Sequence, residues 1–320
     1  MQIIDTTEFE LQGEYSVAIG KFDGIHRGHK KLIDTIMSYK ENGMKTAVFT
    51  FEPSPVAFFG NGTYKGLTTR DEKRHIFEKL GVDVLIEYPL NKESASVSAK
   101  NFVTDILIKK MHTKVIVCGP DFTFGDKGSG NVATLKSLGD ELGYEVVVCE
   151  KVKRIATDLK PENNKETSAC GATNASEDIS STLIRKEVEA GQMELVTEHI
   201  GAYYSVTGVV VKGKQIGRTI GLPTINIVPQ EDKLLPPYGV YEALVSVQGG
   251  RYKGITNIGV KPTVTEEKKV VVETFILDYS GDLYGSTITV NLLRMVRPER
   301  KFGSIEELKA QIESDIKSIQ

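Results

Sequence analysis

Two histidines stand close together in a glycine-rich segment near the start of the chain. The segment reads GKFDGIHRGH over residues 20–29, and a helical pattern follows it. Its glycines permit a sharp turn and a close approach of the backbone to a ligand. The following helix would point its unpaired N–H groups and partial positive charge at that ligand. The segment predicts a phosphate site served by His26 and His29; alone, the pair is equally typical of a helix cap or a solvated surface.

Two later segments carry related chemistry. Ser180, Ser181 and Thr182 open a predicted helix, and Arg185 lies one turn further on. Hydroxyl, N–H and guanidinium donors suit a polyphosphate, although such a cluster is also a common helix N-cap. The loop GPDFTFG at residues 119–125 sets two phenylalanines among glycines. These rings either pack into the core or form the wall of a pocket for a flat ligand.

The second half of the chain has one dense segment, KGKQIGRTIGLPTIN at residues 212–226. Its glycines and cations favour a loop that binds a polyphosphate, and they are equally typical of a surface β-turn. The segment is not a Walker A loop, because its glycine spacing is one residue too short. Thr224 and Asn226, two apart on a predicted strand, face the same side and suit a hard divalent cation. Glu273 stands in the middle of an apolar strand, where a carboxylate either points to solvent or lines a site.

The elements that must position the first set of residues alternate between strands and helices. Strands rich in Val and Ile are predicted at 16–20, 46–51, 82–86, 114–118 and 145–149, with helices at 31–40, 70–80, 98–110, 135–142 and 181–190. This alternation predicts an α/β domain with a doubly wound parallel sheet. Ligands of such sheets bind beyond the carboxyl ends of the strands.

The second half changes to strands separated by glycine-rich turns, at 205–211, 240–247, 252–258, 270–277 and 287–292. No helical pattern interrupts them, so we expect a small closed antiparallel β-barrel. A capping box at Ser304 starts a C-terminal helix. We place the domains at residues 1–191 and 204–320, with a linker at 192–203 and a polar insertion at 158–178.

Composition narrows the class of protein. The chain has 320 residues, 40 basic and 43 acidic, and a net charge of −3. That balance argues against a nucleic-acid partner, and no apolar run reaches the ~20 residues that span a bilayer. The acidic N-terminus is unlike a signal peptide. Three cysteines without a CxxC pair predict neither disulfides nor a zinc site. We expect a cytoplasmic protein with no membrane partner.

As a set, the first-half motifs resemble the flavin-nucleotide branch of the HxGH nucleotidyltransferases. From about Tyr204 onward, the motifs PTIN, YGVY, NIGVKPT, VETFILD, DLYG and RPERKF follow the order of riboflavin kinases. The whole chain resembles the bacterial bifunctional riboflavin kinase/FAD synthetases. The resemblance implies a six-stranded barrel that phosphorylates riboflavin with ATP to FMN. It also implies a nucleotidyltransferase domain that moves AMP from ATP to FMN, giving FAD and pyrophosphate. Mg²⁺ is the implied cofactor, and small molecules are the implied partners.

The resemblance also assigns roles to residues. The implied catalytic residues are His26, His29, Arg185 and Glu273, the last as general base on the ribityl hydroxyl. The implied ATP contacts of the adenylyltransferase are Gly20, Phe22, Asp23, Gly28, Ser180, Ser181 and Thr182. Its implied flavin and nucleotide loop comprises Asp121, Phe122, Phe124, Gly125 and Asn131. The implied ATP contacts of the kinase are Gly213, Gly217, Arg218, Gly221, Thr224 and Asn226, of which Thr224 and Asn226 also hold the metal; Arg297 meets the flavin.

The chain departs from the family pattern at several positions. Ser54 stands where the family usually has His between two prolines, and Ile225 replaces Ala in the Pro-Thr-Ala-Asn signature. The insertion at 158–178 is longer than usual, and residues 201–204 read GAYY where GRPY is common. Two alternatives stay open: a monofunctional riboflavin kinase with a weakened first domain, and a flavin or nucleotide sensor without turnover.

Overall fold

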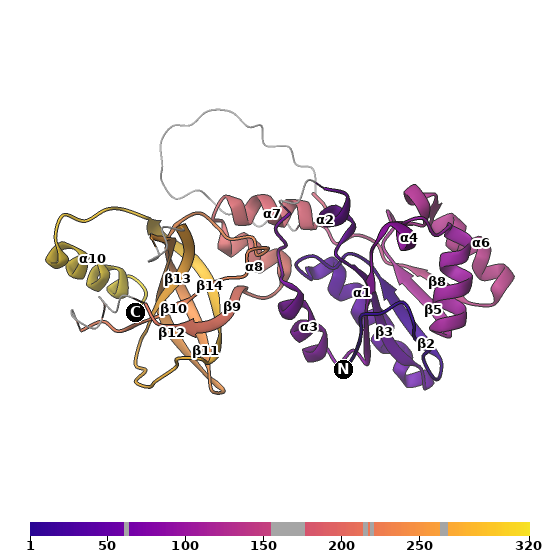
Figure 1. Ribbon diagram of the computed structural model, residues 1–320, viewed down its shortest axis with the longest axis horizontal. Coiled ribbons are helices and arrows are strands. Elements are labelled where there is room, and N and C mark those ends of the chain that lie inside the picture. The colour runs from indigo at the N-terminus through magenta and orange to yellow at the C-terminus, as the bar shows by residue number, and fades with distance from the viewer. Residues whose placement is uncertain (61–63, 155–176, 214–216, 218–220, 263–267) are drawn as a thin grey trace, which may run out of the picture. The chain divides into compact units, whose positions relative to one another are not determined.

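The computed structural model describes residues 1–60, 64–154, 177–213, 217, 221–262 and 268–320. The chain forms two compact units. The first comprises Met1–Phe59 and Phe77–Ser180, and the second comprises Gly60–Ile76 and Ser181–Gln320 (Figure 1). Among the described residues, no helix is both long enough and apolar enough to cross a membrane.

A six-stranded parallel sheet forms the centre of the first unit. Its order is β1-β4-β3-β2-β5-β8. The strands are β1 (Gln2–Ile4), β2 (Tyr15–Ile19), β3 (Lys45–Glu52), β4 (Val84–Pro89), β5 (Thr113–Cys118) and β8 (Glu145–Val148). The doubly wound α/β prediction is confirmed. The sequence missed β1, because three residues are too few to show a strand pattern.

Helices connect these strands. They are α1 (Arg27–Ser38), η1 (Tyr39–Asn42), α2 (Pro55–Phe59), α3 (Arg70–Lys79), α4 (Lys92–Ala95), α5 (Ala99–Asn101), η2 (Phe102–Lys110), η3 (Asp126–Gly128) and α6 (Val132–Leu142). The helix predicted at 98–110 is a single α turn that continues as the π-helix η2. A short hairpin of β6 (Thr123–Phe124) and β7 (Gly130–Asn131) lies between β5 and α6.

The strand order creates a switch point in the sheet. From β2 the chain proceeds to β3 and β4 on one side, then returns to β5 and β8 on the other. The loops after β2 and β5 diverge there, and this is where open α/β sheets bind ligands. The glycine-rich segment that carries His26 directly follows β2.

The second unit contains a closed antiparallel barrel of order β10-β13-β12-β11-β14-β9. Its strands are β9 (Tyr204–Val211), β10 (Thr224–Ile227), β11 (Gly239–Val247), β12 (Gly250–Pro262), β13 (Lys268–Ile276) and β14 (Thr287–Pro298). Helix α10 (Ile305–Lys317) begins at Ser304, whose hydroxyl accepts from the Glu307 N–H. The predicted six-stranded barrel and C-terminal helix are confirmed.

Two helices precede the barrel, α7 (Ser181–Glu189) and α8 (Met193–Ile200). Helix α8 occupies the segment that the sequence analysis treated as a linker. It buries Met193, Val196 and Ile200, and its His199 pairs with Glu187 of α7 at 2.9 Å. The short helix was missed because glycines at both ends resemble loop signals. Residues 60–76 also pack with the second unit, although in sequence they belong to the first predicted domain.

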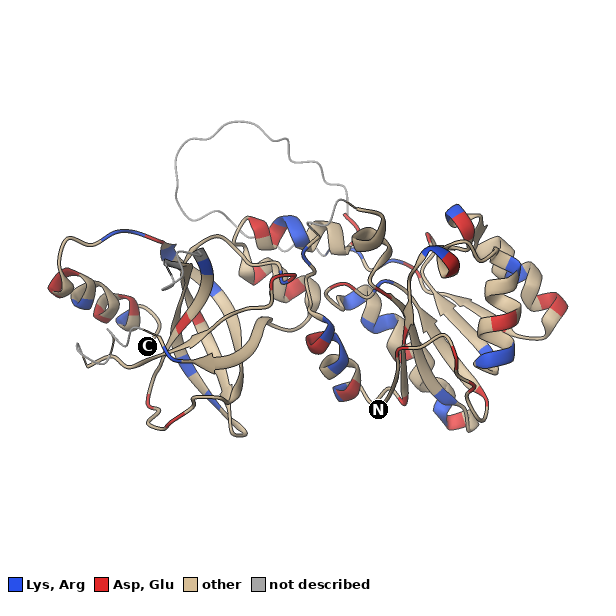
Figure 2. Ribbon diagram, viewed as in Figure 1, with Lys and Arg blue, Asp and Glu red and all other residues tan. Residues whose placement is uncertain are grey.

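Charged residues of both signs are interspersed over the described helices and strands of each unit (Figure 2). The expected absence of a nucleic-acid partner stays a prediction. The insertion predicted at 158–178 lies outside the described residues except for its last two positions.

Candidate active sites

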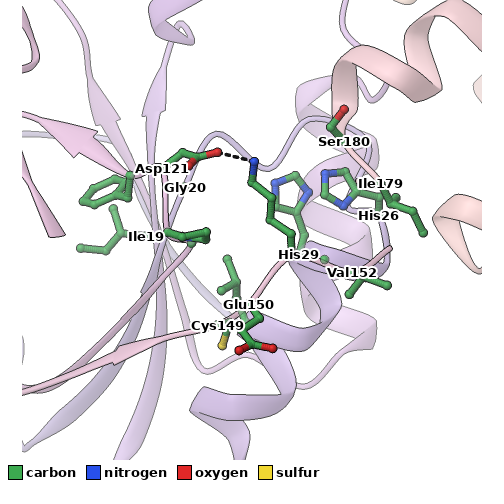
Figure 3. A pocket seen from close by; sticks show the side chains of 16 residues that line it. Ile19, Gly20, His26, His29, Asp121, Cys149, Glu150, Val152, Ile179 and Ser180 are labelled. Atoms are coloured by element: carbon green, nitrogen blue, oxygen red, sulfur yellow. Dashed lines mark ion pairs between the residues drawn. The ribbon is translucent and has the colours of Figure 1, made fainter. Parts of the chain in front are cut away.

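The two predicted phosphate-binding histidines line one cavity of the first unit. This cavity has a volume of about 280 Å³ and lies at the carboxyl ends of β2, β5 and β8. The rings of His26 and His29 stack with their centroids 3.8 Å apart. Figure 3 shows them side by side near Ser180. The expected residues that line this cavity are Gly20, His26, Gly28, His29, Asp121, Phe122 and Ser180.

The turn between β2 and α1 explains the position of the histidines. Phe22 and Ile25 have positive φ angles of 49° and 40°, an uncommon conformation for residues with a side chain. His26 is the N-cap residue of α1, yet its side chain makes no capping hydrogen bond. A Cβ at Gly28 would lie 3.1 Å from the His26 ring, so this glycine leaves room for the imidazole. The histidines are therefore not a helix-capping pair.

His26 is an uncharged hydrogen-bonding group at neutral pH. Its side chain is buried, and burial lowers its pKa from 6.5 to about 4, with a smaller opposing contribution from Asp23. Its Nδ1 atom is buried without a hydrogen-bond partner among the described residues. A buried polar atom of this kind calls for a ligand or a water as its partner. The geometry suits donation to a phosphate oxygen by a neutral imidazole.

Lys151 supplies a positive charge that the sequence analysis missed. It lines the same cavity, and its ammonium group pairs with Asp121 at 2.5 Å, the ion pair marked by the dashed line in Figure 3. It also pairs with Asp178 at 3.3 Å. These hydrogen bonds raise the pKa of Lys151. The cation was missed because it follows β8 in a segment without a motif, and only the parallel sheet brings it near the histidines.

A second cavity of about 710 Å³ lies beside the same loops. Consecutive residues face the two cavities: Gly20 and Phe122 line the first, while Lys21 and Thr123 line the second. Aromatic and apolar side chains contribute much of its wall, namely Phe51, Phe58, Phe59, Leu90, Phe102 and Phe124. Of these, the sequence analysis named only Phe124. The others were missed because they come from β3, α2, η2 and the segment after β4, and no motif joins these elements.

Several expected contacts have structural roles here. Phe22 is fully buried and packs against His29 and Phe77. The Asn131 side chain caps α6 by accepting from the Thr134 N–H at 3.1 Å, and Asn131 lines neither cavity. The Ser54 hydroxyl accepts from the Ala57 N–H at 3.3 Å and so caps α2. The departure at Ser54 therefore has a structural explanation.

The predicted hydroxyl cluster is divided between the two compact units. Ser180 ends the first unit, whereas Ser181, Thr182 and Arg185 belong to α7 in the second. The Arg185 guanidinium donates to the Lys65 carbonyl at 2.5 Å and lies 4.8 Å from the centroid of the Tyr64 ring. The assignment of these three residues to the phosphate site stays a prediction.

The barrel brings three of the expected kinase residues together. Thr224 and Asn226 lie on β10, and Glu273 lies on the adjacent β13, directly opposite Asn226. The Thr224 hydroxyl donates to the Glu273 carboxylate at 2.7 Å. Residues opposite one another on antiparallel strands share a face. A carboxylate, an amide and a hydroxyl therefore converge at one corner of the barrel.

Two described glycines of the 212–226 segment, Gly213 and Gly217, lie close to this corner. A Cβ at Gly213 would lie 2.6 Å from the Asn226 amide nitrogen, and one at Gly217 would strike the Leu222 carbonyl. Gly221 has a positive φ of 80°. These glycines allow the segment to approach the polar corner. Arg218 lies outside the described residues.

Arg297 contacts the C-terminal helix. Its guanidinium makes bonds of 2.9–3.1 Å to the buried carboxylate of Asp315 on α10, and it lies 5.6 Å from the centroid of the Phe302 ring. This bidentate pairing joins the end of β14 to α10. The observed contacts of Arg297 connect the barrel to α10. The flavin contact expected of Arg297 stays a prediction.

Two sequence families match the chain. The FAD synthetase family matches residues 8–160, and the riboflavin kinase family matches residues 200–320. The bifunctional riboflavin kinase/FMN adenylyltransferase of Bacillus subtilis is 34% identical over 311 residues, covering 96% of this chain and 92% of the relative. A protein of the same name from Buchnera aphidicola is 35% identical over 315 residues, covering 97% and 94%.

A solved structure agrees with this assignment of the fold over the whole chain. A crystal structure described as a macrolide-efflux protein from Streptococcus pneumoniae has a TM-score of 0.81 and 28% identity, and the match covers 99% of both chains. That description concerns the pneumococcal protein alone. The sheet unit and the barrel define a transferase that joins a nucleotidyltransferase to a flavokinase. The chain belongs to the bifunctional riboflavin kinase/FMN adenylyltransferase family.

Proposed function

We propose that the barrel phosphorylates riboflavin beside Glu273, and that the sheet unit adenylylates the resulting FMN in its two adjoining cavities. The family match supports the pair of activities. The observation that carries the residue assignment is the convergence of Thr224, Asn226 and Glu273 at one corner of the barrel. The stacked histidines at the switch point of the sheet support the second site.

In the adenylyltransferase, the polyphosphate of ATP would occupy the histidine cavity. The neutral His26 and its neighbour His29 would donate to phosphate oxygens, while the N-terminus of α1 adds positive potential. The isoalloxazine of FMN would lie in the aromatic cavity, whose wall includes Phe58 and Phe124. The FMN phosphate then attacks the α-phosphorus in line, and pyrophosphate leaves. Because no covalent intermediate is needed, the residues act by positioning the reactants and by stabilising charge.

In the kinase, Glu273 would accept the proton of the primary ribityl hydroxyl while the hydroxyl oxygen attacks the γ-phosphorus of ATP, and ADP would leave as FMN forms. The Thr224 hydroxyl orients this carboxylate, because it donates its only proton to Glu273. The lone pairs of that hydroxyl remain for a cation. Asn226, beside Gly213, would meet the phosphates of ATP.

We propose Mg²⁺ as the cofactor, held in the kinase by Thr224 and Asn226 with the phosphates of ATP. The oxygen donors at this corner are the hard ligands that Mg²⁺ takes in proteins. Within the described residues, no group of three or more His, Cys, Asp or Glu side chains forms a metal site. A metal here would therefore depend on phosphate oxygens. When bound, Mg²⁺ neutralises charge on the transferred and leaving phosphates.

We also propose that small molecules are the partners of this cytoplasmic enzyme, and that neither nucleic acids nor membranes are. The net charge of −3 supports this reading, since nucleic-acid binders usually carry a basic excess. As domains we propose residues 1–191 and 204–320, with α8 in the connecting segment rather than an extended linker.

One assay tests the proposal. The full chain is incubated with riboflavin, ATP and Mg²⁺, and FMN is resolved from FAD by chromatography. We expect FAD to accumulate. FMN alone would indicate a monofunctional kinase, and neither product would indicate a sensor without turnover.

Variants assign the two steps to the two sites. Glu273→Gln should reduce FMN formation by at least about 10³-fold, because it removes the base, while FMN adenylylation stays within two-fold of wild type. His29→Ala should do the reverse. In each variant the unaffected activity shows that the other unit is intact, and a variant that loses both would contradict independent sites.

A further inference from the structure

We infer that Asn257 is a further substrate-binding residue of the kinase site, and that it holds the secondary hydroxyls of the polyol beside Glu273. This inference rests on the proposed kinase function of the barrel. Asn257 lies on β12 and is the first residue of the NIGVKPT motif, to which the sequence analysis assigned no role.

The register of three strands places Asn257 next to the proposed base. Glu273 on β13 lies opposite Asn226 of β10 on one side and opposite Asn257 of β12 on the other. Opposite residues of antiparallel strands share a face, with Cβ atoms about 4.5–5.5 Å apart. An amide, a carboxylate and a second amide therefore form one row of about 10 Å across three strands.

This row lies on the outer face of the barrel. The next residues along the strands, Thr256 and Thr274, are fully buried and hydrogen-bonded to each other at 2.9 Å, so they point into the barrel. Beyond Asn257 the row continues to Val240, which packs with Ile316 and Ile319 at the end of α10. One end of the row is thus polar and the other is apolar.

The two flanks of Glu273 have different tasks. On the β10 flank, Gly213 packs against Asn226, and Thr224 donates to Glu273. We therefore assign the β10 side of Glu273 as the place where the phosphates of ATP bind. In-line transfer requires the accepting hydroxyl to lie on the far side of the γ-phosphorus from the leaving oxygen. The alcohol must therefore approach Glu273 from the β12 flank, where Asn257 lies.

The chemistry of Asn257 matches a polyol. Its side chain is half-buried and makes no hydrogen bond to another described residue, so its amide can contact a ligand. An amide offers both donors and an acceptor, as does each hydroxyl of a ribityl chain. Gly259, two residues further on the same face, leaves room beside Asn257 for the side chain of Glu299. A Cβ there would lie 3.3 Å from the Asn257 nitrogen and would strike the carboxylate of Glu299.

Steady-state kinase kinetics of Asn257→Ala test the inference. We expect KM for riboflavin to rise about ten-fold, the effect of about 1.4 kcal/mol of lost binding, while KM for ATP stays within two-fold. The matched control is Arg251→Ala, an exposed residue of the same strand, which should change neither constant. A kcat and a KM for ATP close to those of wild type show that the barrel of the variant is folded, whereas adenylylation of added FMN reports only on the other unit.

A substrate analogue separates a binding role from a structural one. A flavin with an unbranched hydroxyalkyl chain keeps the primary hydroxyl but lacks the secondary hydroxyls. Wild type should have a higher kcat/KM for riboflavin than for this analogue. In Asn257→Ala the ratio of the two kcat/KM values should be about ten-fold smaller than in wild type. Asn257→Ser, a smaller hydroxyl-bearing variant, should keep part of it and provides a second test if the alanine variant is unstable.

Three results would overturn the inference: an unchanged KM for riboflavin, an equal rise in both KM values, or an unchanged preference for riboflavin over the analogue. Failure of the proposed function is a separate outcome, because wild type would then make no FMN at all.

Discussion

At the scale of single residues, burial decides what the imidazole of His26 can do. The ring is 7% exposed, and loss of solvent lowers its pKa to about 4 despite the nearby Asp23. An imidazole with that pKa is neutral at pH 7, so in the proposed site it would donate a hydrogen bond to phosphate without contributing a full charge. The N-terminus of α1 supplies positive potential there, whereas the charge of Lys151 is already paired with Asp121 and Asp178.

The first prediction concerns the titration of His26. With only five histidines in the chain, the imidazole signals can be followed by NMR, and the His26→Gln variant assigns the relevant one. We expect the His26 signal to stay unchanged from pH 8 to pH 5 and to shift only near pH 4. A midpoint near 6.5 would show that the ring is solvated.

The same pKa makes stability depend on pH. Between pH 6.5 and about 4, the unfolded chain binds a proton at this histidine and the folded chain does not. Its contribution to the free energy of unfolding is therefore complete above pH 6.5 and is lost as the pH falls toward 4, by up to about 3 kcal/mol. Chemical unfolding at pH 7 and pH 5 should show a smaller loss in His26→Gln than in wild type.

Ser54 gives the second prediction. Because its hydroxyl caps α2, Ser54→Ala should destabilise that helix by about 1 kcal/mol. Helix α2 carries Phe58 and Phe59 of the aromatic cavity, so we expect KM for FMN in adenylyl transfer to rise several-fold. KM for riboflavin in the kinase reaction should not change. Equal FMN affinity in variant and wild type would show that α2 does not form the flavin wall.

At the scale of elements, one ion pair attaches α10 to the barrel. Asp315 is 3% exposed and accepts from Arg297 of β14 and from Gln311 of α10, so its carboxylate is fully engaged. Asp315 is the one residue of α10 that is fully buried, while the apolar residues of the helix remain partly exposed. The position of α10 therefore depends on polar bonds as well as on apolar packing.

The third prediction follows from this pair. Asp315→Asn removes the negative partner of the partly buried Arg297, and weakening hydrogen bonds to a charged group typically costs about 1.5–3 kcal/mol. Urea unfolding followed by kinase activity should show this loss, whereas adenylyltransferase activity should persist. The matched control is Glu313→Gln, an exposed residue whose contact with Lys309 spans 4.0 Å. Equal stability of both variants would contradict a structural role for the pair.

At the scale of the whole molecule, the compact units do not coincide with continuous stretches of the sequence, because one segment of the first half belongs to the second unit. Residues 60–76 lie inside the FAD synthetase match, yet they pack with the barrel unit. Gly66 forms a parallel bridge with Lys233, and the Lys233 ammonium pairs with Glu72 at 2.7 Å. Both side chains are buried, and Glu72 also accepts from the Thr207 N–H of β9.

The fourth prediction tests this packing in the full chain. Glu72→Gln removes the partner of a buried cation and should destabilise the barrel unit by about 3–5 kcal/mol. Kinase activity should therefore be lost at a lower temperature than in wild type, although residue 72 belongs in sequence to the adenylyltransferase. Glu78→Gln, an exposed change on the same helix, is the control. Unchanged thermal inactivation of the kinase would contradict this role of Glu72.

Local sequence signals predicted much of this molecule. The β-branched runs predicted five of the six parallel strands, because continuous apolar strands buried on both faces have a distinctive composition. The motif at residues 20–29 predicted that His26 and His29 share one site, since a tight glycine turn holds both residues together. Thr224 and Asn226 were expected on one face because side chains alternate along a strand.

Other features depend on residues that are distant in the chain. Lys151, the aromatic cavity and the row from Asn226 through Glu273 to Asn257 each join several elements, and no local spacing reveals them. Sequence by itself determined most of the elements, the two fold classes and the motif residues, because these follow from periodicity and turn chemistry; β1 and α8 were exceptions. Strand order and register alone decided which distant side chains meet, how deeply His26 is buried and where residues 60–76 pack, because these depend on contacts that form only when the chain folds.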